Sequence, residues 1–337
     1  MAVAGKNMFR RIAGVLTAAC LAVSPLAAAH ADDVGNLRDA FDSTFGTETR
    51  APRTYDSPFE QRIAYLASAE QGRIGVAAVD LATGRSLDIL GSQRFPMAST
   101  SKIAIAATFL EGVDKGRWSL TSEFPMLIPV RSAAFSTPVA PVREGKYLPA
   151  HELIELMLTR SSNAATDALL RVVGGPRAVN AWVRKAGISD FSIDRDIATL
   201  VRDDGEVDPA TAIDLRDSAT PLAMVQLLSG LHRGEWLSDR SRQVLLGAMS
   251  RCITGKRRIP ALLPEEAMIQ HKTGSLNNTS SDVGIVHTLD GRAFAVAIYV
   301  TGQGGKLNRE QRIASIARAL YDGYQTEASG MRRTASR

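Results

Sequence analysis

The pattern of apolar and polar positions predicts strands near both ends of the chain and helices between them. Ser57-Pro58, followed by apolar residues at 59, 63 and 66, predicts a helix through Ala69, because Ser suits an N-cap and Pro the first helical position. Two short runs over 72–90, separated by turn residues 82–85, predict a β-hairpin. Apolar runs over 267–273, 283–289 and 293–300 predict three further strands, the last two joined by a turn at Asp290-Gly291.

The central part of the chain, from Ser99 to about Leu231, has mainly helical periodicity. A polar stretch with prolines at 131–149 and a loop at 194–217 interrupt it. A terminal amphipathic helix is predicted over 310–324, and the polar, basic residues 326–337 are expected to form a flexible tail. Together these elements predict an α+β fold, with a sheet part at about 57–98 and 232–325 and a helical part at about 99–231.

The first 31 residues have the pattern of a cleaved secretory signal. An apolar, Ala-rich stretch over 12–29 lies between basic residues and an A-x-A-like exit, namely Lys6, Arg10, Arg11 and Ala29-His30-Ala31. A membrane span is the weaker alternative, because the stretch is barely long enough and contains a proline, and lipidation at Cys20 is another. We therefore expect cleavage after Ala31, a linker over 32–56, no stable membrane span, and a periplasmic or extracellular location.

Composition and charge narrow the function classes. The chain has 337 residues, 45% of them hydrophobic, and a net charge of +5, values typical of a globular protein. Removal of the signal lowers that charge by three, so electrostatics give no basis for nucleic-acid binding. Cys20 leaves with the signal, and Cys252 alone cannot form an internal disulfide and has no assigned role. Without C-x-x-C or H-E-x-x-H spacing, no metal or cofactor is expected.

A candidate nucleophile precedes the apolar segment 103–110. If Ser99 opens that helix, Lys102 lies one turn later on the same face. A Ser hydroxyl needs a nearby base, and a partly buried Lys with a lowered pKa can take its proton. An S-x-x-K sequence is common by chance, so Ser99 as an ordinary helix-start residue followed by a solvated Lys102 is the alternative interpretation.

Two further short motifs follow in order. Ser161-Ser162-Asn163 comes after an apolar helix, and Lys272-Thr273-Gly274 ends a strand. Each has a purely structural alternative, a polar helix cap for the first and a strand exit with a turn glycine for the second. The three motifs in this order, at a helix start, a loop and a strand, form the signature of penicillin-recognising serine enzymes.

The chain from about Ser57 to Tyr324 therefore resembles the superfamily of class A β-lactamases and penicillin-binding serine peptidases. Further matching segments are Arg94-Phe95-Pro96-Met97, Gly174-Gly175-Pro176, Arg216-Asp217-Ser218, Thr220-Pro221 and Thr301-Gly302. The resemblance implies an antiparallel five-stranded sheet flanked by helices, with an inserted all-helical subdomain, over residues 57–325. It also implies a monomer that acts on a small β-lactam or on a peptidoglycan stem peptide.

The same resemblance implies roles for the motif residues. Ser99 would attack the carbonyl, Lys102 would be the acylation base or its partner, and Ser161 would pass a proton to the leaving nitrogen. Asn163 would bind a substrate amide, and Lys272-Thr273-Gly274 the substrate carboxylate. Backbone N–H groups of Ser99 and Ser275 would form the oxyanion hole. Many members place an arginine near the carboxylate; here Arg258 matches one alternative source, while an exposed basic loop is the structural interpretation.

One position departs from the resemblance. Class A β-lactamases carry a glutamate in a pattern like Asp-Arg-x-Glu-Pro that holds the water for deacylation, but here Ile197 stands at that place and cannot accept a proton. Arg195 and Asp217 can still form the salt bridge that closes this loop. Asp196 is one possible substitute for the glutamate, and the longer loop offers five more acids: Asp203, Asp204, Glu206, Asp208 and Asp214.

Three functions remain open on this evidence. The leading one is an exported serine hydrolase that forms an acyl-enzyme with β-lactams and hydrolyses them, slowly if no acid replaces the glutamate. The second is a D-Ala-D-Ala carboxypeptidase or penicillin-binding peptidase. The third, from a different class, is a sensor that binds β-lactams or cell-wall fragments without turnover.

Overall fold

The computed structural model describes Tyr55 and residues 57–335, with side chains described through Thr326. The expected signal over 1–31 lies outside the described residues, and so does the expected linker over 32–56 except for Tyr55.

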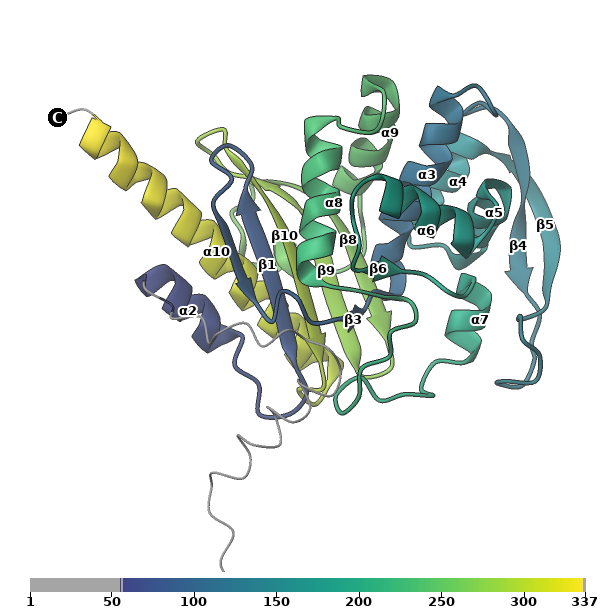
Figure 1. The fold of residues 1–337 in the computed structure, drawn as a ribbon, viewed down its shortest axis with the longest axis horizontal. Helices are drawn as coiled ribbons and strands as arrows, with labels where there is room; N and C mark the ends of the chain where they lie inside the picture. Colours follow the sequence, from purple (N-terminus) through teal and green to yellow (C-terminus); the bar gives the residue numbers. More distant parts are fainter. Residues whose placement is uncertain (1–54, 56, 336–337) are drawn as a thin grey trace, which may run out of the picture. The chain divides into compact units, whose positions relative to one another are not determined.

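The fold is built on a five-stranded antiparallel sheet with strand order β2-β1-β10-β9-β8 (Figure 1). The predicted hairpin is confirmed as β1 (Ile74–Asp80) and β2 (Ser86–Ile89). The predicted C-terminal strands are β8 (Met268–Leu276), β9 (Thr279–His287) and β10 (Ala293–Thr301). Because β1 pairs with β10, the two ends of the domain form one sheet, as the resemblance implied.

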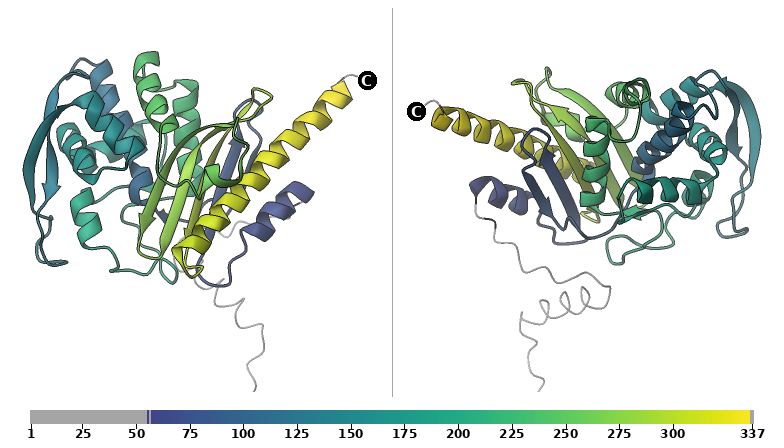
Figure 2. Two further views of the ribbon diagram at one scale, coloured as in Figure 1. Left: turned by 180° about the vertical axis from the view of Figure 1, so that it is seen from behind. Right: turned by 45° about the horizontal axis from the view of Figure 1, so that its top comes forward.

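Helices cover both faces of this sheet, as Figure 2 shows from two sides. Val76 and Ile298 lie in one buried cluster with residues of α2 (Pro58–Leu66) and α10 (Lys306–Ala335). Ala77 and Tyr299, one position further along their strands, belong to a second cluster with α3 (Lys102–Asp114) and α8 (Pro221–Arg233). The two-residue period of a strand thus divides the apolar residues between two cores.

The helical part contains α3, α4 (Ala150–Thr159), α5 (Asn163–Val173), α6 (Pro176–Lys185) and the short α7 (Ile197–Arg202). The helix α8 packs on β1 and β10 of the sheet. Most of α8 falls within residues 99–231, which the sequence places in the helical part. The helix α9 (Asp239–Ser250) packs on β8 as well as on α3 and α4.

The helical part is not entirely helical. Strands β4 (Glu123–Pro129) and β5 (Val142–Pro149) form an antiparallel ribbon, so part of the polar stretch at 131–149 is a strand. Most residues of β5 are not buried, which removes the apolar alternation that identifies strands in a sequence. The ribbon is held by contacts of β4 with α5, which local sequence does not show.

Three very short strands, β3 (Phe95–Pro96), β7 (Ser218–Ala219) and β6 (Phe191–Ser192), join the start of the helical part to the end of the 194–217 loop. The terminal helix is also longer than predicted. It runs through Ala335, over most of the segment expected to be a flexible tail, because residues 325–335 contain no proline and several good helix formers.

Candidate active site

The Ser99 motif forms a tight turn at the start of α3. Residues Ala98–Ser101 make a 3-10 helix, and the backbone N–H of Lys102 donates to the carbonyl of Ser99. Ala98 has a φ of 48°, a left-handed conformation that costs a non-glycine residue roughly 1–3 kcal/mol and often marks functional sites. Ser99 is partly exposed, whereas Lys102 is completely buried. The solvated-lysine interpretation of the motif is therefore wrong.

The strand end that carries Lys272 lies directly against this turn. A Cβ atom added to Gly274 would sit 2.5 Å from the carbonyl oxygen of Met97 and 3.2 Å from the Cβ of Ala98. Only glycine allows two backbones to approach this closely. Gly274 therefore lets the end of β8 pack against the turn that carries Ser99, although the two segments are far apart in the sequence.

Ser161 connects the two lysines. Its hydroxyl oxygen accepts a hydrogen bond from Lys102 Nζ at 3.2 Å and from Lys272 Nζ at 3.0 Å. Lys102 Nζ also donates to the Ser161 carbonyl at 2.8 Å. Ser161 has a φ of 57°, a second strained non-glycine residue at this place. The three sequence motifs thus converge on one hydroxyl group.

Burial sets the charge of these lysines. It lowers the pKa of Lys102 well below its usual range, and the nearby charge of Lys272 lowers that pKa further, while Asp167 opposes the shift. Burial also lowers the pKa of Lys272 to about 8, helped by Arg258 and opposed by Cys252 and Asp282. A buried lysine of this kind can give up its proton near neutral pH and act as a base.

Asn163 and Thr273, both expected to bind substrate, are held by protein partners. The side-chain oxygen of Asn163 accepts from Lys102 Nζ at 2.7 Å. The Thr273 hydroxyl lies 2.6 Å from that of Thr254, and Thr273 is 6% exposed. These contacts fix the two side chains in place before any substrate arrives.

Arg258 is buried, so it is not part of an exposed basic loop. It is 3% exposed and donates to the carbonyls of Gly274 at 2.8 Å and Ser281 at 2.7 Å. It also donates to the Ser275 hydroxyl at 2.6 Å and pairs with Glu310 of α10 at 3.2 Å. This guanidinium therefore stands beside the Lys272 motif and adds positive charge there.

A Cys–His–Asp chain behind Lys272 was not found from the sequence. Nδ1 of His271 lies 2.9 Å from the carboxylate of Asp282, which is fully buried, and His271 also hydrogen-bonds Cys252. Burial alone would lower the pKa of His271, but the Asp282 carboxylate outweighs it and raises this pKa to about 10. The position of His271 next to Lys272 was the one available sequence signal.

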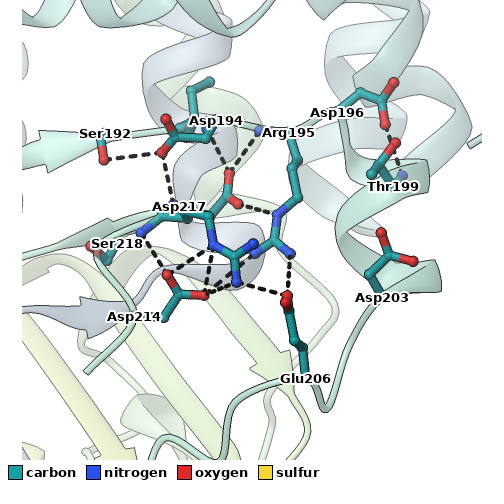
Figure 3. A network of polar contacts seen from close by, with 12 residues as sticks. Ser192, Asp194, Arg195, Asp196, Thr199, Asp203, Glu206, Asp214, Asp217 and Ser218 are labelled. Carbon is teal, nitrogen blue, oxygen red and sulfur yellow. Dashed lines mark hydrogen bonds and ion pairs between the residues drawn. The ribbon is translucent and has the colours of Figure 1, made fainter. Parts of the chain in front are cut away.

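The loop at 194–217, here called the acidic loop, is closed by an ion pair. Nε of Arg195 lies 2.6 Å from Asp217 Oδ2, and the other Asp217 oxygen accepts from the backbone N–H groups of Asp194 and Arg195 (Figure 3). Asp217 is buried and has a φ of 48°. The contact joins the start of the loop to β7, as the sequence led us to expect.

Each of the five additional acids of this loop has a structural partner. Asp203 pairs with Arg202 at 2.7 Å, which lowers its pKa to about 2, and Asp204 accepts from the backbone of Asn277 at 2.8 Å. The remaining three form contacts with arginines or with the β8–β9 turn: Glu206 and Asp214 with Arg216, and Asp208 with Asn278. Asp204 and Asp208 therefore attach the acidic loop to the β8–β9 turn, whereas Glu206 and Asp214 stabilise the loop from within.

Asp196, the possible substitute for the missing glutamate, and Ile197, which stands in its place, also have structural contacts. Asp196 caps α7 by accepting from the backbone N–H of Thr199 at 2.7 Å (Figure 3). Ile197 is 4% exposed, so it packs inside the protein. Its backbone N–H donates to Asp167 of α5, a buried carboxylate that sequence inspection missed because it lies inside an ordinary helical pattern.

The remaining expectations concern metals and membranes. Over residues 57–335, no group of three or more His, Cys, Asp or Glu side chains is placed to hold a metal ion. Within the same range, no helix combines the length and hydrophobicity needed to cross a bilayer.

Comparisons with known proteins agree with the fold and the motifs. The model of the beta-lactamase enzyme family matches residues 58–324. The imipenem-hydrolyzing beta-lactamase of Enterobacter cloacae is 30% identical over 257 residues, 74% of this chain and 84% of that protein. Beta-lactamase CTX-M-25 of Escherichia coli is 32% identical over 268 residues, 79% of this chain and 89% of that protein.

Solved structures give the same result. A beta-lactamase from Chitinophaga pinensis superposes with a TM-score of 0.69 at 29% identity, covering 80% of this chain and all of that one. A variant of the last common ancestor of Gram-negative class A beta-lactamases gives a TM-score of 0.68 at 31% identity, with the same coverage. A buried lysine pair joined by one serine, on a matching fold and sequence, leads to one conclusion: the chain belongs to the beta-lactamase enzyme family, within the superfamily of class A β-lactamases and penicillin-binding proteins.

Proposed function

We propose that this β-lactamase-like hydrolase is an exported active-site serine enzyme in which Ser99 forms an acyl-enzyme with β-lactams. The observation that carries the proposal is the Lys102–Ser161–Lys272 contact beside Ser99, with Ser161 within 3.2 Å of both ammonium groups. Lys102, whose pKa is lowered by burial, would take the proton of the Ser99 hydroxyl. The Ser99 oxygen would then attack the carbonyl carbon of the lactam.

The second half of acylation breaks the carbon–nitrogen bond. Backbone N–H groups of Ser99 and Ser275 would stabilise the oxyanion, and the substrate carboxylate would face Lys272 and Arg258. Ser161 would donate its proton to the leaving nitrogen and regain one from a lysine ammonium. The Ser99 ester would remain, and water must hydrolyse it to complete one turnover.

Hydrolysis of the Ser99 ester is the step that should limit turnover. With Ile197 at the expected glutamate position and every acid of the loop in a structural contact, the general base for deacylation is missing, which typically costs about 10²–10⁴-fold. The same observation supports a second candidate, a D-Ala-D-Ala carboxypeptidase or penicillin-binding peptidase of the cell wall. Such an enzyme also forms the Ser99 ester with a β-lactam but does not need to release it quickly.

One experiment separates these functions. The mature protein, starting after Ala31, is mixed with a chromogenic cephalosporin, product is followed over time, and intact mass is recorded. Sustained turnover supports a β-lactamase, and a stoichiometric burst with a stable adduct supports a peptidase. Binding without an adduct supports a sensor and overturns the acyl-enzyme mechanism.

Ser99→Ala and Ser101→Ala are the matched variants. Ser101 is in the same turn, is buried, and donates its hydroxyl to the Ala98 carbonyl at 2.8 Å. We expect Ser99→Ala to lose both burst and adduct and Ser101→Ala to retain them. If Ser99→Ala keeps the wild-type adduct, Ser99 is not the nucleophile.

A further inference from the structure

Two histidines and a glutamine meet in a pocket at the β8 edge of the sheet. His232 lies in the last turn of α8, His287 ends β9, and Gln270 lies on β8. The pocket has a volume of about 400 Å³, and all three residues line it and are partly exposed. No motif described above includes them, and the mechanism proposed for Ser99 does not use them.

The strand register explains why these side chains meet. Side chains alternate between the two faces of a strand, so His287 lies on the same face as Ile285, which belongs to the core that contains α8. Gln270 is paired with Ile285 across the β8–β9 ladder, and directly paired residues share a face. The helix α8 brings His232 to this face. Three elements therefore deliver one side chain each to the same pocket.

The donor atoms are spaced as the ligands of one metal ion are. Nε2 of His287 lies 3.4 Å from Oε1 of Gln270, longer than an ordinary N–H···O hydrogen bond. Two donors bound to one tetrahedral ion at about 2.1 Å are roughly 3.4 Å apart. The ring centroids of His232 and His287 are 6.0 Å apart, and two imidazoles that share an ion have centroids roughly 5–6 Å apart.

The surroundings favour neutral imidazoles, the form that binds metals. Burial lowers the pKa of both histidines, and for His232 three neighbouring basic side chains lower it further, namely His287, Arg242 and Arg233. A neutral imidazole has a free nitrogen lone pair at neutral pH. The pocket therefore holds two ready nitrogen donors and one carboxamide oxygen.

The positive charge close to the pocket is largely neutralised. Both nearby arginines are ion-paired with acids: Arg242 with Asp239 at 2.9 Å, and Arg233 with Glu235 at 2.6 Å. Arg242 also donates to the backbone carbonyl of His232 at 2.7 Å. Because its donors are already used, Arg242 is poorly placed to bind an anion in the pocket, and it repels a cation less than a free arginine does.

We propose that His232, His287 and Gln270 form a binding site for a divalent transition-metal ion of the zinc type. Two imidazole nitrogens and the carboxamide oxygen supply three ligands, and water supplies the fourth of a tetrahedral set. The ion joins α8 to β8 and β9, so it stabilises the folded chain, in which alone the three donors are close together. This inference does not rest on the proposed function.

The first test is zinc binding by the mature protein, purified without a histidine tag and freed of metals with a chelator. We expect calorimetry to give one Zn²⁺ per protein and no binding of Mg²⁺, which prefers oxygen ligands. The thermal unfolding midpoint should rise by about 5 °C when free Zn²⁺ is about 100 times its dissociation constant. An absence of zinc binding, or several weak and equivalent sites, overturns the proposal.

Variants then identify the ligands. His232→Gln and His287→Gln should each weaken Zn²⁺ binding about 10-fold or more, since even groups that only support a ligand contribute that much. His151→Gln, which removes an exposed histidine outside the pocket, is the control and should bind like wild type. Equal losses in all three variants would contradict the assignment.

A gain of affinity tests the third ligand without relying on a variant that loses stability. Gln270→Glu replaces the carboxamide by a carboxylate and creates the His₂Glu set found in zinc enzymes. We expect it to bind Zn²⁺ more tightly than wild type. An unchanged or weaker affinity overturns the place of Gln270 in the site.

The last test examines the wild-type protein with Co²⁺ in place of Zn²⁺. Nitrogen and oxygen ligands in a tetrahedral site give visible absorption without the strong near-ultraviolet band of a cobalt–thiolate bond. A thiolate band would place the ion on Cys252 and overturn the proposal. Inorganic phosphate that raises the unfolding midpoint of wild type but not of His232→Gln, in a protein that binds no metal, would show an anion site and overturn it as well.

Discussion

The Ser99 side and the acidic loop of this site differ in what their charged groups do. On the Ser99 side, Lys102 and Lys272 are completely buried, both have lowered pKa values, and both contact the hydroxyl of Ser161. On the loop side, charged residues are more numerous, but they pair with arginines, backbone amides or helix ends. Reactive groups in this site are therefore those that are buried without a neutralising partner. The number of charged residues in a region does not show where the reactive groups are.

The comparison also separates the two half-reactions. The side that would form the acyl-enzyme has its base and its proton relay in contact. The side that would hydrolyse it has Ile197, an apolar side chain that is 4% exposed. Each variant below therefore alters one side and leaves the other intact.

The largest effect is expected for Lys102→Gln, which keeps the size of the side chain and removes the base. The acylation rate should fall about 10²–10⁴-fold, the usual contribution of a general base. The rate of adduct formation with the cephalosporin measures this change. Lys115→Gln, at the exposed C-terminal end of the same helix, is the control and should stay near wild type. An unchanged rate in Lys102→Gln would remove Lys102 from the mechanism.

Next in size is the gain expected from Ile197→Glu. A carboxylate at this place should speed release of the acyl group about 10-fold or more, less than the full effect of a base because its position is not optimised. Release is measured by intact mass after excess β-lactam is removed.

Ile197→Gln has the same shape without the charge and should not speed release. Both variants should be less stable by about 1–3 kcal/mol, because a polar group enters a buried position. Equal release rates in the two variants would show that the missing carboxylate is not what limits deacylation.

A smaller effect separates two arginines of the acidic loop. The side chain of Arg195 is 17% exposed and its partner Asp217 5%, whereas that of Arg216 is 43% exposed. Arg195→Gln leaves a buried carboxylate without its cation and should lower the free energy of unfolding by about 2 kcal/mol. Arg216→Gln should cost less than about 1 kcal/mol, as exposed pairs do. Urea unfolding of both variants tests the difference, and equal losses would contradict it.

The smallest expected effects are pH-dependent contributions to stability. One is lost at acid pH on the loop side, and the other is lost at alkaline pH on the Ser99 side. Hydrogen bonds to Arg202 lower the pKa of Asp203 to about 2, so its contribution to stability is present above about pH 4 and disappears as the pH falls towards 2. Asp282 raises the pKa of His271 to about 10 against the effect of burial, so that contribution is full below about pH 6.5 and disappears as the pH rises through 10.

Urea midpoints of Asp203→Asn and His271→Asn measure both effects. The difference between wild type and Asp203→Asn should vanish at acid pH, and that between wild type and His271→Asn at alkaline pH. A constant difference across the pH range would mean that the variant acts through packing alone.

The sequence alone predicted much of the fold because its signals are local. The N-cap at Ser57, the apolar strand segments 74–80 and 293–301, and the Asp290-Gly291 turn are set by neighbouring residues. The ribbon of β4 and β5 and the full length of α10 were missed. Strand β5 has little apolar alternation, and the end of a helix without a proline is weakly encoded.

For the site, the sequence determined which groups are present: a serine with a lysine one turn later, the Ser161 and Lys272 motifs, and an isoleucine at the place of a glutamate. Only the tertiary structure decided what those groups touch. It brought Ser161 within reach of two lysines, buried Arg258 against Ser275, and set Asp167 against the backbone of Ile197. The physical reason is that burial, and the proximity of residues far apart in the chain, determine the pKa of a group. Neither quantity can be read from the order of residues in the sequence.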